Sequence, residues 1–129
     1  MKSKLFLAFL IIMVTALVLV GCSSSDETEI SEDTYIAVIS KGFQHQFWQA
    51  VRTGAENAAE DYGVTITFEG PETEAMVDKQ VEMVQAALDK KPAALALAAL
   101  DTQALIPLLE RAQEDGIPVV GFDSGVDSN

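Results

Sequence analysis

The sequence predicts an α/β protein with a parallel β-sheet and helices on both of its faces. Short apolar runs rich in β-branched residues alternate with longer stretches whose apolar residues recur every three or four positions. The links between them are short and rich in glycine, proline and aspartate. Such alternation is typical of parallel strands joined by right-handed crossovers. We therefore expect the order β-α-β-α-β-α-β over residues 34–129.

The first strand is expected over residues 35–39, an apolar run that suits burial on both faces of a sheet. A polar loop follows over residues 40–46, and helical spacing then begins. Gly63 is expected to end this helix in a left-handed conformation. The apolar residues expected on its buried face are Trp48, Val51, Ala55, Ala58 and Tyr62.

The second strand is expected over residues 64–68, where β-branched and aromatic residues alternate with threonine. In the helix that follows, Glu74, Asp78 and Glu82 recur every four residues. We interpret these carboxylates as the solvated face of the helix, because calcium loops have a different, glycine-containing spacing. The apolar residues of its buried face are Val77, Val81, Val84 and Leu88.

The third strand is expected over residues 93–99, a run that periodicity alone would also allow as helix. Asp101 or Thr102 is expected to cap the third helix, with Pro107 in its first turns. The fourth strand is expected over residues 119–122. The residues expected to form the buried stripe of the third helix are Leu105, Leu108, Leu109 and Ala112.

The composition excludes several functional classes. The chain has 20 acidic and 8 basic residues, for a net charge of −12, which argues against nucleic acid as a partner. One cysteine and one histidine exclude a disulfide within the chain and argue against a Cys/His zinc site. No dinucleotide, Walker or nucleophile-elbow motif occurs. We therefore expect a binding protein without cofactor or metal, and not an enzyme.

Residues 1–21 are expected to be a signal peptide. Two lysines precede an apolar run over residues 5–20, and the motif LVGC ends at Cys22, the only cysteine. The motif resembles the lipobox of bacterial lipoproteins, which implies a multiply acylated Cys22. Residues 22–33 are rich in serine and acid and are expected to be a flexible tether to the domain. An ordinary signal peptide or a short membrane anchor is the alternative.

Polar and aromatic residues follow the four expected strands. Because the carboxyl ends of parallel strands meet at one edge, these residues are expected to share a ligand site. Carboxylates and amides hydrogen-bond hydroxyl groups, and aromatic rings suit the C–H faces of sugars. The site therefore suits a small polyhydroxylated molecule. The candidate residues are Gln44, His45, Gln46, Phe47, Trp48, Glu69, Asp101 and Asp123.

Residues 34–129 resemble the periplasmic sugar-binding proteins of ribose/galactose type. These proteins serve ABC importers and share their fold with the ligand domains of LacI-type repressors. Besides the loop and aromatic pair after the first strand, the resemblance is carried by GVTITFEGPETEAMVDKQVEMV, ALALAALDTQAL and GIPVVGFDSGVDS. It implies a type I periplasmic binding protein fold. On this interpretation, residues 34–129 form an incomplete amino-terminal lobe without the second lobe and hinge. A complete small domain of four strands and three helices is the alternative.

The resemblance also implies roles for individual residues. Phe47 and Trp48 match an aromatic pair that packs on the sugar, although core packing of Trp48 is an alternative. His45 or Gln44 matches a polar residue that hydrogen-bonds the sugar. Asp123 matches an aspartate that holds two hydroxyl groups.

Other positions leave the identity of the sugar open. Asp101 matches an aspartate near the cleft, but it is first a candidate helix cap. Ser124 stands where many members have arginine, and His45-Gln46 stands where the ribose-binding type has Asn-Pro. Asp123 is the candidate that a purely structural role explains least.

The expected function is the capture of a small sugar or polyol outside the cytoplasm and its delivery to the permease of an ABC importer. The protein would be anchored to the extracytoplasmic face of the membrane through Cys22. The alternative is a lipid-anchored sensor that presents its ligand to a receptor or sensor kinase, and the sequence does not separate the two. The signal peptide and the lack of an amino-terminal helix-turn-helix argue against a transcription regulator.

Overall fold

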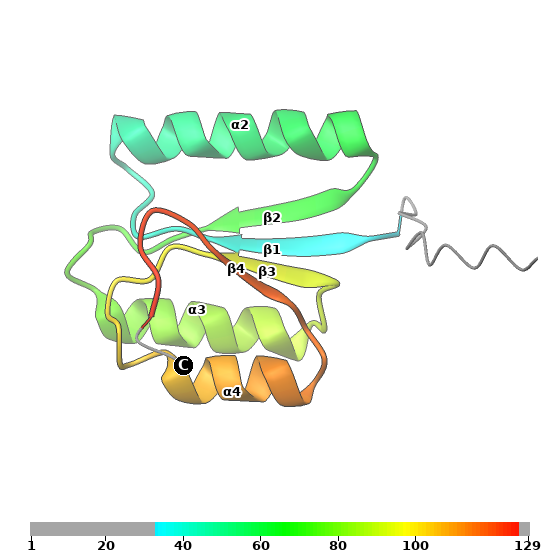
Figure 1. The fold of residues 1–129 in the computed structure, drawn as a ribbon. Coiled ribbons are helices and arrows are strands. Elements are labelled where there is room, and N and C mark those ends of the chain that lie inside the picture. Colours follow the sequence, from blue (N-terminus) through cyan, green and yellow to red (C-terminus); the bar gives the residue numbers. More distant parts are fainter. Residues whose placement is uncertain (1–32, 127–129) are drawn as a thin grey trace, which may run out of the picture.

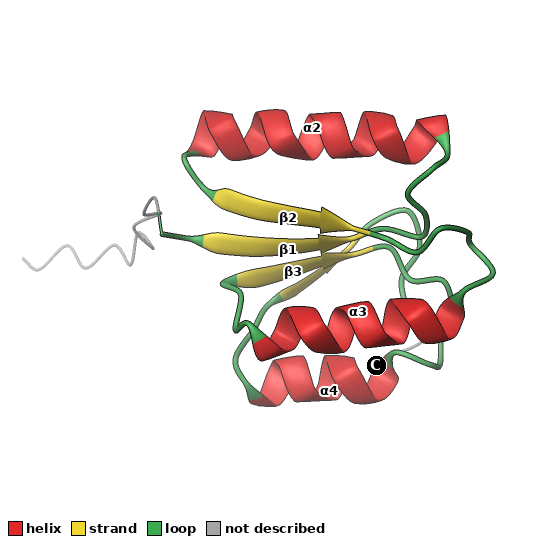
Figure 2. Ribbon diagram, turned by 180° about the vertical axis from the view of Figure 1, so that it is seen from behind, coloured by secondary structure: helices red, strands yellow, loops and turns green. Residues whose placement is uncertain are grey.

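A computed structural model describes residues 33–126. The four strands form one parallel sheet with the order β2-β1-β3-β4. Helix α2 covers one face, and helices α3 and α4 lie side by side on the other (Figures 1 and 2). The predicted fold class and element order are confirmed. The elements in chain order are β1 (Tyr35–Ile39), α2 (Gln46–Tyr62), β2 (Thr65–Glu69), α3 (Val77–Asp89), β3 (Ala94–Leu97), α4 (Ile106–Glu114) and β4 (Val119–Gly121).

The pairing of the strands explains where the predicted bounds shift. Strand β2 pairs with β1 from Tyr35↔Thr65 to Ile39↔Glu69, so it begins and ends one residue later than expected. Strand β3 is shorter than expected because Ile39↔Leu97 is its last pair with β1. Beyond that pair, one more backbone bond, from the N–H of Ala98 to the carbonyl of Ile39, ends the pairing of the two strands.

Helix α2 ends as expected, but part of its predicted buried face is wrong. Gly63 has φ 64° and donates its N–H to the last turn of the helix. Ala58 and Tyr62 are exposed, whereas Ala59 is buried. At about 100° per residue, Ala59 lies about 20° from the direction of Trp48, and Ala58 lies about 80° away. Tyr62, in the last turn, is 70% exposed.

The main apolar core lies between the sheet and helices α3 and α4. The predicted stripe of α4 is confirmed, with Leu105 and Ala112 buried and its two other leucines packed against the core. Within residues 33–126, no helix is long and apolar enough to cross a membrane. The residues buried in this core are Ala37, Ile39, Val84, Ala87, Leu88, Leu95, Leu97, Ala99, Leu105, Ala112 and Ile117.

The prediction that Asp101 or Thr102 caps the third helix is wrong. The helix begins at Ile106, with Leu105 at the N-cap position and Pro107 in its first turn. The Asp101 carboxylate instead accepts hydrogen bonds from the backbone N–H groups of Gln103 (2.8 Å) and Ala104 (2.7 Å). It therefore caps the tight turn that precedes the helix, because the chain makes that turn before the regular hydrogen-bond pattern begins.

Candidate functional site

The loops that follow the four strands gather at one end of the sheet (Figure 1). We call residues 40–47, 70–76, 98–105 and 122–124, which include the start of α2, the strand-end rim. Strand β1 has β2 on one side and β3 on the other. The strands that follow β1 in the chain therefore lie on both sides of it, which makes β1 the switch point of the sheet. In open α/β sheets, ligands bind outside the carboxyl ends of the strands at such a switch point.

Ser40 joins the loops that follow β1 and β2. Its side chain is buried, and its single O–H lies between two acceptors, the carbonyls of Gly42 at 2.7 Å and Glu69 at 3.2 Å. Its backbone N–H also donates to the Glu69 carbonyl at 2.8 Å. A Cβ added to Gly70 would lie 2.3 Å from the Ser40 hydroxyl. Glu69 is the last residue of β2. Its backbone carbonyl accepts the bonds from Ser40 and so holds the loop after β1 against the end of β2.

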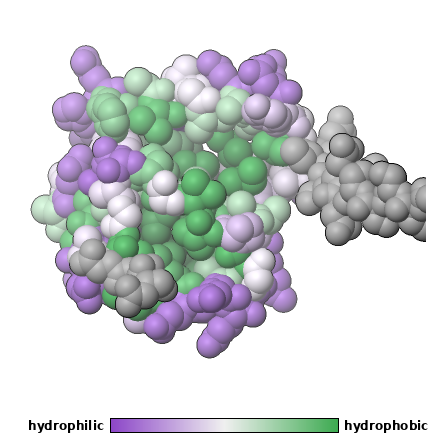
Figure 3. Space-filling model, viewed as in Figure 1, coloured by the Kyte–Doolittle hydropathy of each residue, from purple (hydrophilic) through white to green (hydrophobic). Residues whose placement is uncertain are grey.

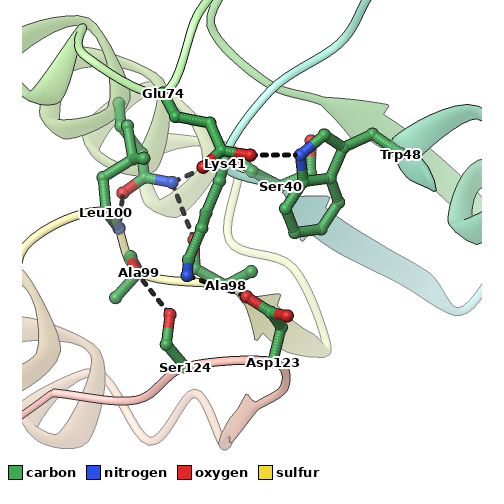
Figure 4. A network of polar contacts seen from close by, with 10 residues as sticks. Ser40, Lys41, Trp48, Glu74, Ala98, Ala99, Leu100, Asp123 and Ser124 are labelled. Carbon is green, nitrogen blue, oxygen red and sulfur yellow. Dashed lines mark hydrogen bonds and ion pairs between the residues drawn. The ribbon is translucent and has the colours of Figure 1, made fainter. Parts of the chain in front are cut away.

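Gln80 joins the loops that follow β1 and β3. Its side chain is fully buried, in the first turn of α3. Its Nε2 donates to the carbonyls of Ser40 (3.0 Å) and Ala98 (2.8 Å), and its Oε1 accepts from the N–H of Leu100 (2.8 Å). Figure 4 shows these three partners converging where the strands separate.

Asp123 carries the candidate carboxylate most directly placed at the rim. Its Oδ2 lies 2.8 Å from the Lys41 Nζ, and the Asp123 and Lys41 side chains are 36% and 20% exposed (Figure 4). Its backbone has φ 57°, a left-handed conformation that aspartate tolerates better than most residues. The carboxylate forms an ion pair across the rim, and because both side chains are partly exposed this pair should add at most about 1 kcal/mol to the stability of the fold.

Ser124, the residue after Asp123, joins the loops that follow β4 and β3. The Ser124 hydroxyl donates to the carbonyl of Ala99 at 2.8 Å. The N–H of Ala99 donates to the carbonyl of Ser124 at 3.1 Å. The ion pair therefore holds the side chain of Asp123, and the two hydrogen bonds between Ser124 and Ala99 hold the backbone that follows it.

The aromatic pair divides into one buried and one exposed ring. Trp48 is 2% exposed, and its Nε1 donates to Glu74 Oε1 at 3.0 Å. This geometry favours the core-packing alternative for Trp48. Phe47 is 49% exposed and packs edge-to-face on Trp48, with ring centroids 4.8 Å apart. Phe47 is therefore the ring of the pair that offers free surface to a ligand.

The predicted acidic face of the second helix is wrong at Glu74. It precedes α3, which begins at Val77, and it accepts the indole N–H of Trp48 because that buried donor needs a partner. Asp78 and Glu82 are exposed on the helix as expected, and Glu82 pairs with Lys79 at 2.6 Å.

The remaining candidates lie around the start of α2 and near α4. His45 is exposed, and its Nδ1 accepts the N–H of Phe47 at 3.2 Å, which makes it the N-cap of α2. Gln44 is exposed in the loop, and Gln46 is the first residue of the helix. The N–H groups of Ala104 and, second, Gln103 hold the pKa of Asp101 below its ordinary value.

Sequence reasoning missed Lys41, Glu74 and Gln80 as parts of this site. A signal existed for Gln80, because it lies three residues after Val77 and four before Val84 and so falls on the predicted buried face. A polar residue at such a position needs hydrogen-bond partners. Lys41 lies in the predicted loop after β1, but no pattern in the sequence pairs it with Asp123.

A cavity of about 780 Å³ lies away from Phe47, Lys41 and Trp48, on the side of the molecule formed by α4 and β4. We call it the α4–β4 groove. Its lining is mostly apolar and includes Ile106, Leu109, Ile117 and Val126. Figure 3 shows apolar residues gathered on this side of the molecule, between α2 and α4. The groove therefore offers apolar contact but few converging polar groups.

Comparisons with known proteins agree with this fold. A family model described as a periplasmic binding protein domain matches residues 36–129. The D-ribose/D-allose-binding protein of Pseudomonas aeruginosa is 26% identical over 122 residues, which cover 89% of this chain and 38% of that protein. The chain thus spans well under half the length of this curated relative.

Solved structures of transport-related binding proteins are also similar to this chain. A protein from Brachyspira murdochii described as an ABC transporter, LacI family transcriptional regulator, is 48% identical with a TM-score of 0.68, over 73% of this chain and 29% of that one. An ABC transporter solute-binding protein from Agrobacterium vitis with bound D-fucose is 42% identical with a TM-score of 0.69, over 73% of this chain and 33% of that one.

Proposed function

Because this chain belongs to the periplasmic binding protein domain family, we propose that it is part of a protein that captures a small sugar or polyol outside the cytoplasm. One observation carries the proposal. The strand-end rim presents the Asp123 carboxylate and the Lys41 ammonium 2.8 Å apart, on the same rim as the exposed Phe47. The similar protein named for D-ribose and D-allose, and the similar solute-binding protein with bound D-fucose, support the same class of ligand.

The chemistry of the rim suits hydroxyl groups. Asp123 accepts hydrogen bonds, Lys41 donates them, and a sugar hydroxyl does both. Two adjacent hydroxyl groups would therefore satisfy both members of the pair. The pair is neutral as a whole, which favours an uncharged polyol. The exposed ring of Phe47 would pack against the C–H face of the sugar, with Trp48 supporting it from behind.

Gln44, His45 and Asp101 are proposed as outer polar contacts. His45 keeps Nε2 for a ligand, since Nδ1 is engaged at the helix start. Asp101 spends Oδ1 on two backbone N–H groups, so Oδ2 is the oxygen proposed to meet a hydroxyl. We expect these three residues to contribute less than Asp123.

Capture requires more protein than this rim. A small ligand is usually buried over most of its surface, and an open rim contacts only one side of a sugar. We infer that a second lobe closes over the rim by a hinge motion, in line with the greater length of the relatives. Titration of D-ribose, D-allose or D-fucose into the 129-residue chain alone should then give weak or no heat, whereas the full-length protein should bind tightly.

We also propose that the captured sugar passes to the permease of an ABC importer and that lipidation of Cys22 holds the protein at the membrane. Cys22 lies outside the described residues, so this rests on the sequence motif. Replacing Cys22 with serine should release the mature protein from the membrane fraction or leave the precursor unprocessed. Membrane retention with unchanged mass would contradict the anchor.

A thermal-shift screen tests the proposed function. The full-length protein is heated with pentoses, hexoses and polyols, each at millimolar concentration. At least one should raise the melting temperature, because a ligand that binds only the folded state stabilises it. An unchanged melting temperature with every sugar and polyol would reject the function.

A further inference from the structure

We propose that Gln80 is a positioning residue that presets the strand-end rim before a ligand arrives. The inference rests on the proposed function at this rim, but it concerns a residue that would not touch the ligand. Gln80 is fully buried beneath the point where β1 and β3 separate. Its single carboxamide forms three hydrogen bonds, and all three end on backbone atoms of two rim loops.

These bonds replace the sheet where the sheet ends. The N–H of Ala98 donates to the carbonyl of Ile39 at 2.9 Å, the last backbone bond between the two strands in this region. One residue further, the carbonyls of Ser40 and Ala98 both accept from Gln80 Nε2. The side chain therefore holds the two loops at a fixed separation that backbone pairing no longer sets.

Two of the three residues bonded to Gln80 directly precede a candidate ligand contact. Ser40 precedes Lys41, and Leu100 precedes Asp101. Gln80 thereby restricts the backbone from which each of these two charged side chains projects. A displacement of either loop would change where its charge lies relative to a bound hydroxyl.

The same bonds extend to Asp123 through one intermediate. Ala99 lies between Ala98 and Leu100, the two residues that Gln80 holds in the loop after β3. Ala99 in turn exchanges two hydrogen bonds with Ser124, the neighbour of Asp123. Gln80 therefore influences both ends of the Lys41–Asp123 ion pair without contacting either side chain.

Filling the core explains the burial of Gln80 but not the direction of its bonds. An apolar side chain of similar length would fill the same space, and burial of an amide is favourable only when its groups are paired. Within residues 33–126, every buried side-chain nitrogen and oxygen has a partner. Fixing the loops in advance would strengthen ligand binding, because less ordering remains to be done on binding.

The test compares Gln80→Met with Val84→Ala in the full-length protein. Val84 is also fully buried in α3, one turn further along, but it makes no bond to the rim. Both variants should lower the melting temperature. Below both transitions, Gln80→Met should weaken binding of D-ribose, D-allose or D-fucose by about tenfold. Val84→Ala should bind within about twofold of wild type.

A readout without ligand separates this inference from the proposed function. In the ligand-free protein, the backbone amide signals of Lys41, Asp101 and Ser124 should broaden in Gln80→Met through microsecond-to-millisecond exchange. They should stay sharp in Val84→Ala. If the wild type binds none of the sugars, the function fails while these signals still decide the role of Gln80. Normal affinity together with sharp signals in Gln80→Met would overturn the role.

Ser124→Ala provides a second variant if Gln80→Met does not fold. It removes only the side-chain bond from Ser124 to Ala99, at a half-buried position. The affinity should fall severalfold, and the amide signal of Asp123 should broaden. Unchanged affinity and a sharp signal would show that the connection from Gln80 to Asp123 has no effect.

Discussion

The strand-end rim and the α4–β4 groove differ in what their surfaces offer. At the rim, charged and polar side chains converge on a small region, and bonds join the loops after β1, β3 and β4 to one another and to the end of β2. The groove encloses about 780 Å³ and is lined mainly by aliphatic side chains. The groove is thus not the place where Asp123 and Lys41 lie together.

The difference favours the rim over the groove as the proposed ligand site. A sugar needs oriented hydrogen bonds to its hydroxyl groups, because leaving them unpaired in a closed site is costly. The groove provides contact without orientation. We therefore propose that the ligand binds at the rim rather than in the groove.

The largest effect is expected from adding a methyl group to the rim. In Gly70→Ala, the new Cβ would lie 2.3 Å from the Ser40 hydroxyl and 3.0 Å from the Gly42 carbonyl oxygen. The loops after β1 and β2 must separate, so the free energy of unfolding should fall by about 3 kcal/mol. Urea denaturation measures the change.

Gly125→Ala is the matched variant beside the groove. Nothing lies within 4 Å of the added Cβ there, so the free energy of unfolding should change by about 0.5 kcal/mol or less. Equal destabilisation by the two substitutions would show that the rim is no more tightly packed than the groove.

Asp123→Asn should cause the largest loss of sugar affinity. Asparagine tolerates the left-handed backbone of this position (φ 57°), so folding should be preserved. The substitution removes the charge and turns one acceptor into a donor, which should weaken binding by about ten- to a hundredfold. Isothermal titration of the full-length protein measures the loss.

Two controls accompany this variant. Glu110→Gln makes the same kind of change in the lining of the groove, and Glu82→Gln makes it on the exposed side of α3. Both should bind sugar as the wild type does. A loss of affinity in Glu110→Gln would move the site from the rim to the groove.

Lys41→Met should weaken binding less than Asp123→Asn does. The methionine keeps the length of the side chain but removes the donor and leaves Asp123 without its ion-pair partner. A loss of about three- to tenfold is expected. Lys79→Met, which removes a lysine from the exposed pair with Glu82, should leave affinity unchanged. If both variants bind equally well, Lys41 has no part in the site.

A smaller effect, on stability alone, is expected between α3 and α4. Arg111 pairs with Asp89 at 2.8 Å and with Asp115 at 3.5 Å, and the hydrogen bond that Arg111 donates to Asp89 does most to raise the pKa of Arg111. These side chains are more than a third exposed, so Arg111→Gln should cost about 0.2–1 kcal/mol. The cost should shrink as sodium chloride is added. Altered sugar affinity in this variant would show that this ion pair is not independent of the rim.

The smallest effect is a dependence on pH at Asp101. The N–H groups of Ala104 and Gln103 lower the pKa of this carboxyl from its ordinary value of 3.8. A lowered folded-state pKa adds stability above the unfolded pKa and loses it as pH falls through the folded one. Wild type should therefore exceed Asp101→Asn in melting temperature by more at pH 7 than at pH 3. A constant difference would exclude this titration.

Much of this organisation could be predicted from the sequence, because it depends on local patterns. The apolar runs and helical spacing placed all four strands and three helices, and Gly63 marked the end of α2. The start of α4 was placed too early, because Asp101 serves equally well as the cap of a turn. Ala58 was chosen over Ala59 because spacing alone does not fix how a helix is rotated on a sheet.

The site itself was only partly predictable. The position of Asp123 after a strand was enough to place it at the rim, but its pairing with Lys41 joins residues 82 positions apart. The burial of Trp48 depends on Gly42 and Glu74, which no periodic pattern connects to it. Contacts between loops are set by the tertiary structure, so they appear only once the strands are in place.

A crystal structure of the full-length protein with its best-binding sugar tests the central claim most directly. The sugar should lie at the strand-end rim, with two of its hydroxyl groups within hydrogen-bond distance of the Asp123 carboxylate and one near the Lys41 ammonium. Its C–H face should rest on the ring of Phe47. A sugar bound against Leu109 and Val126 in the α4–β4 groove, or bound without contact to Asp123, would contradict the account.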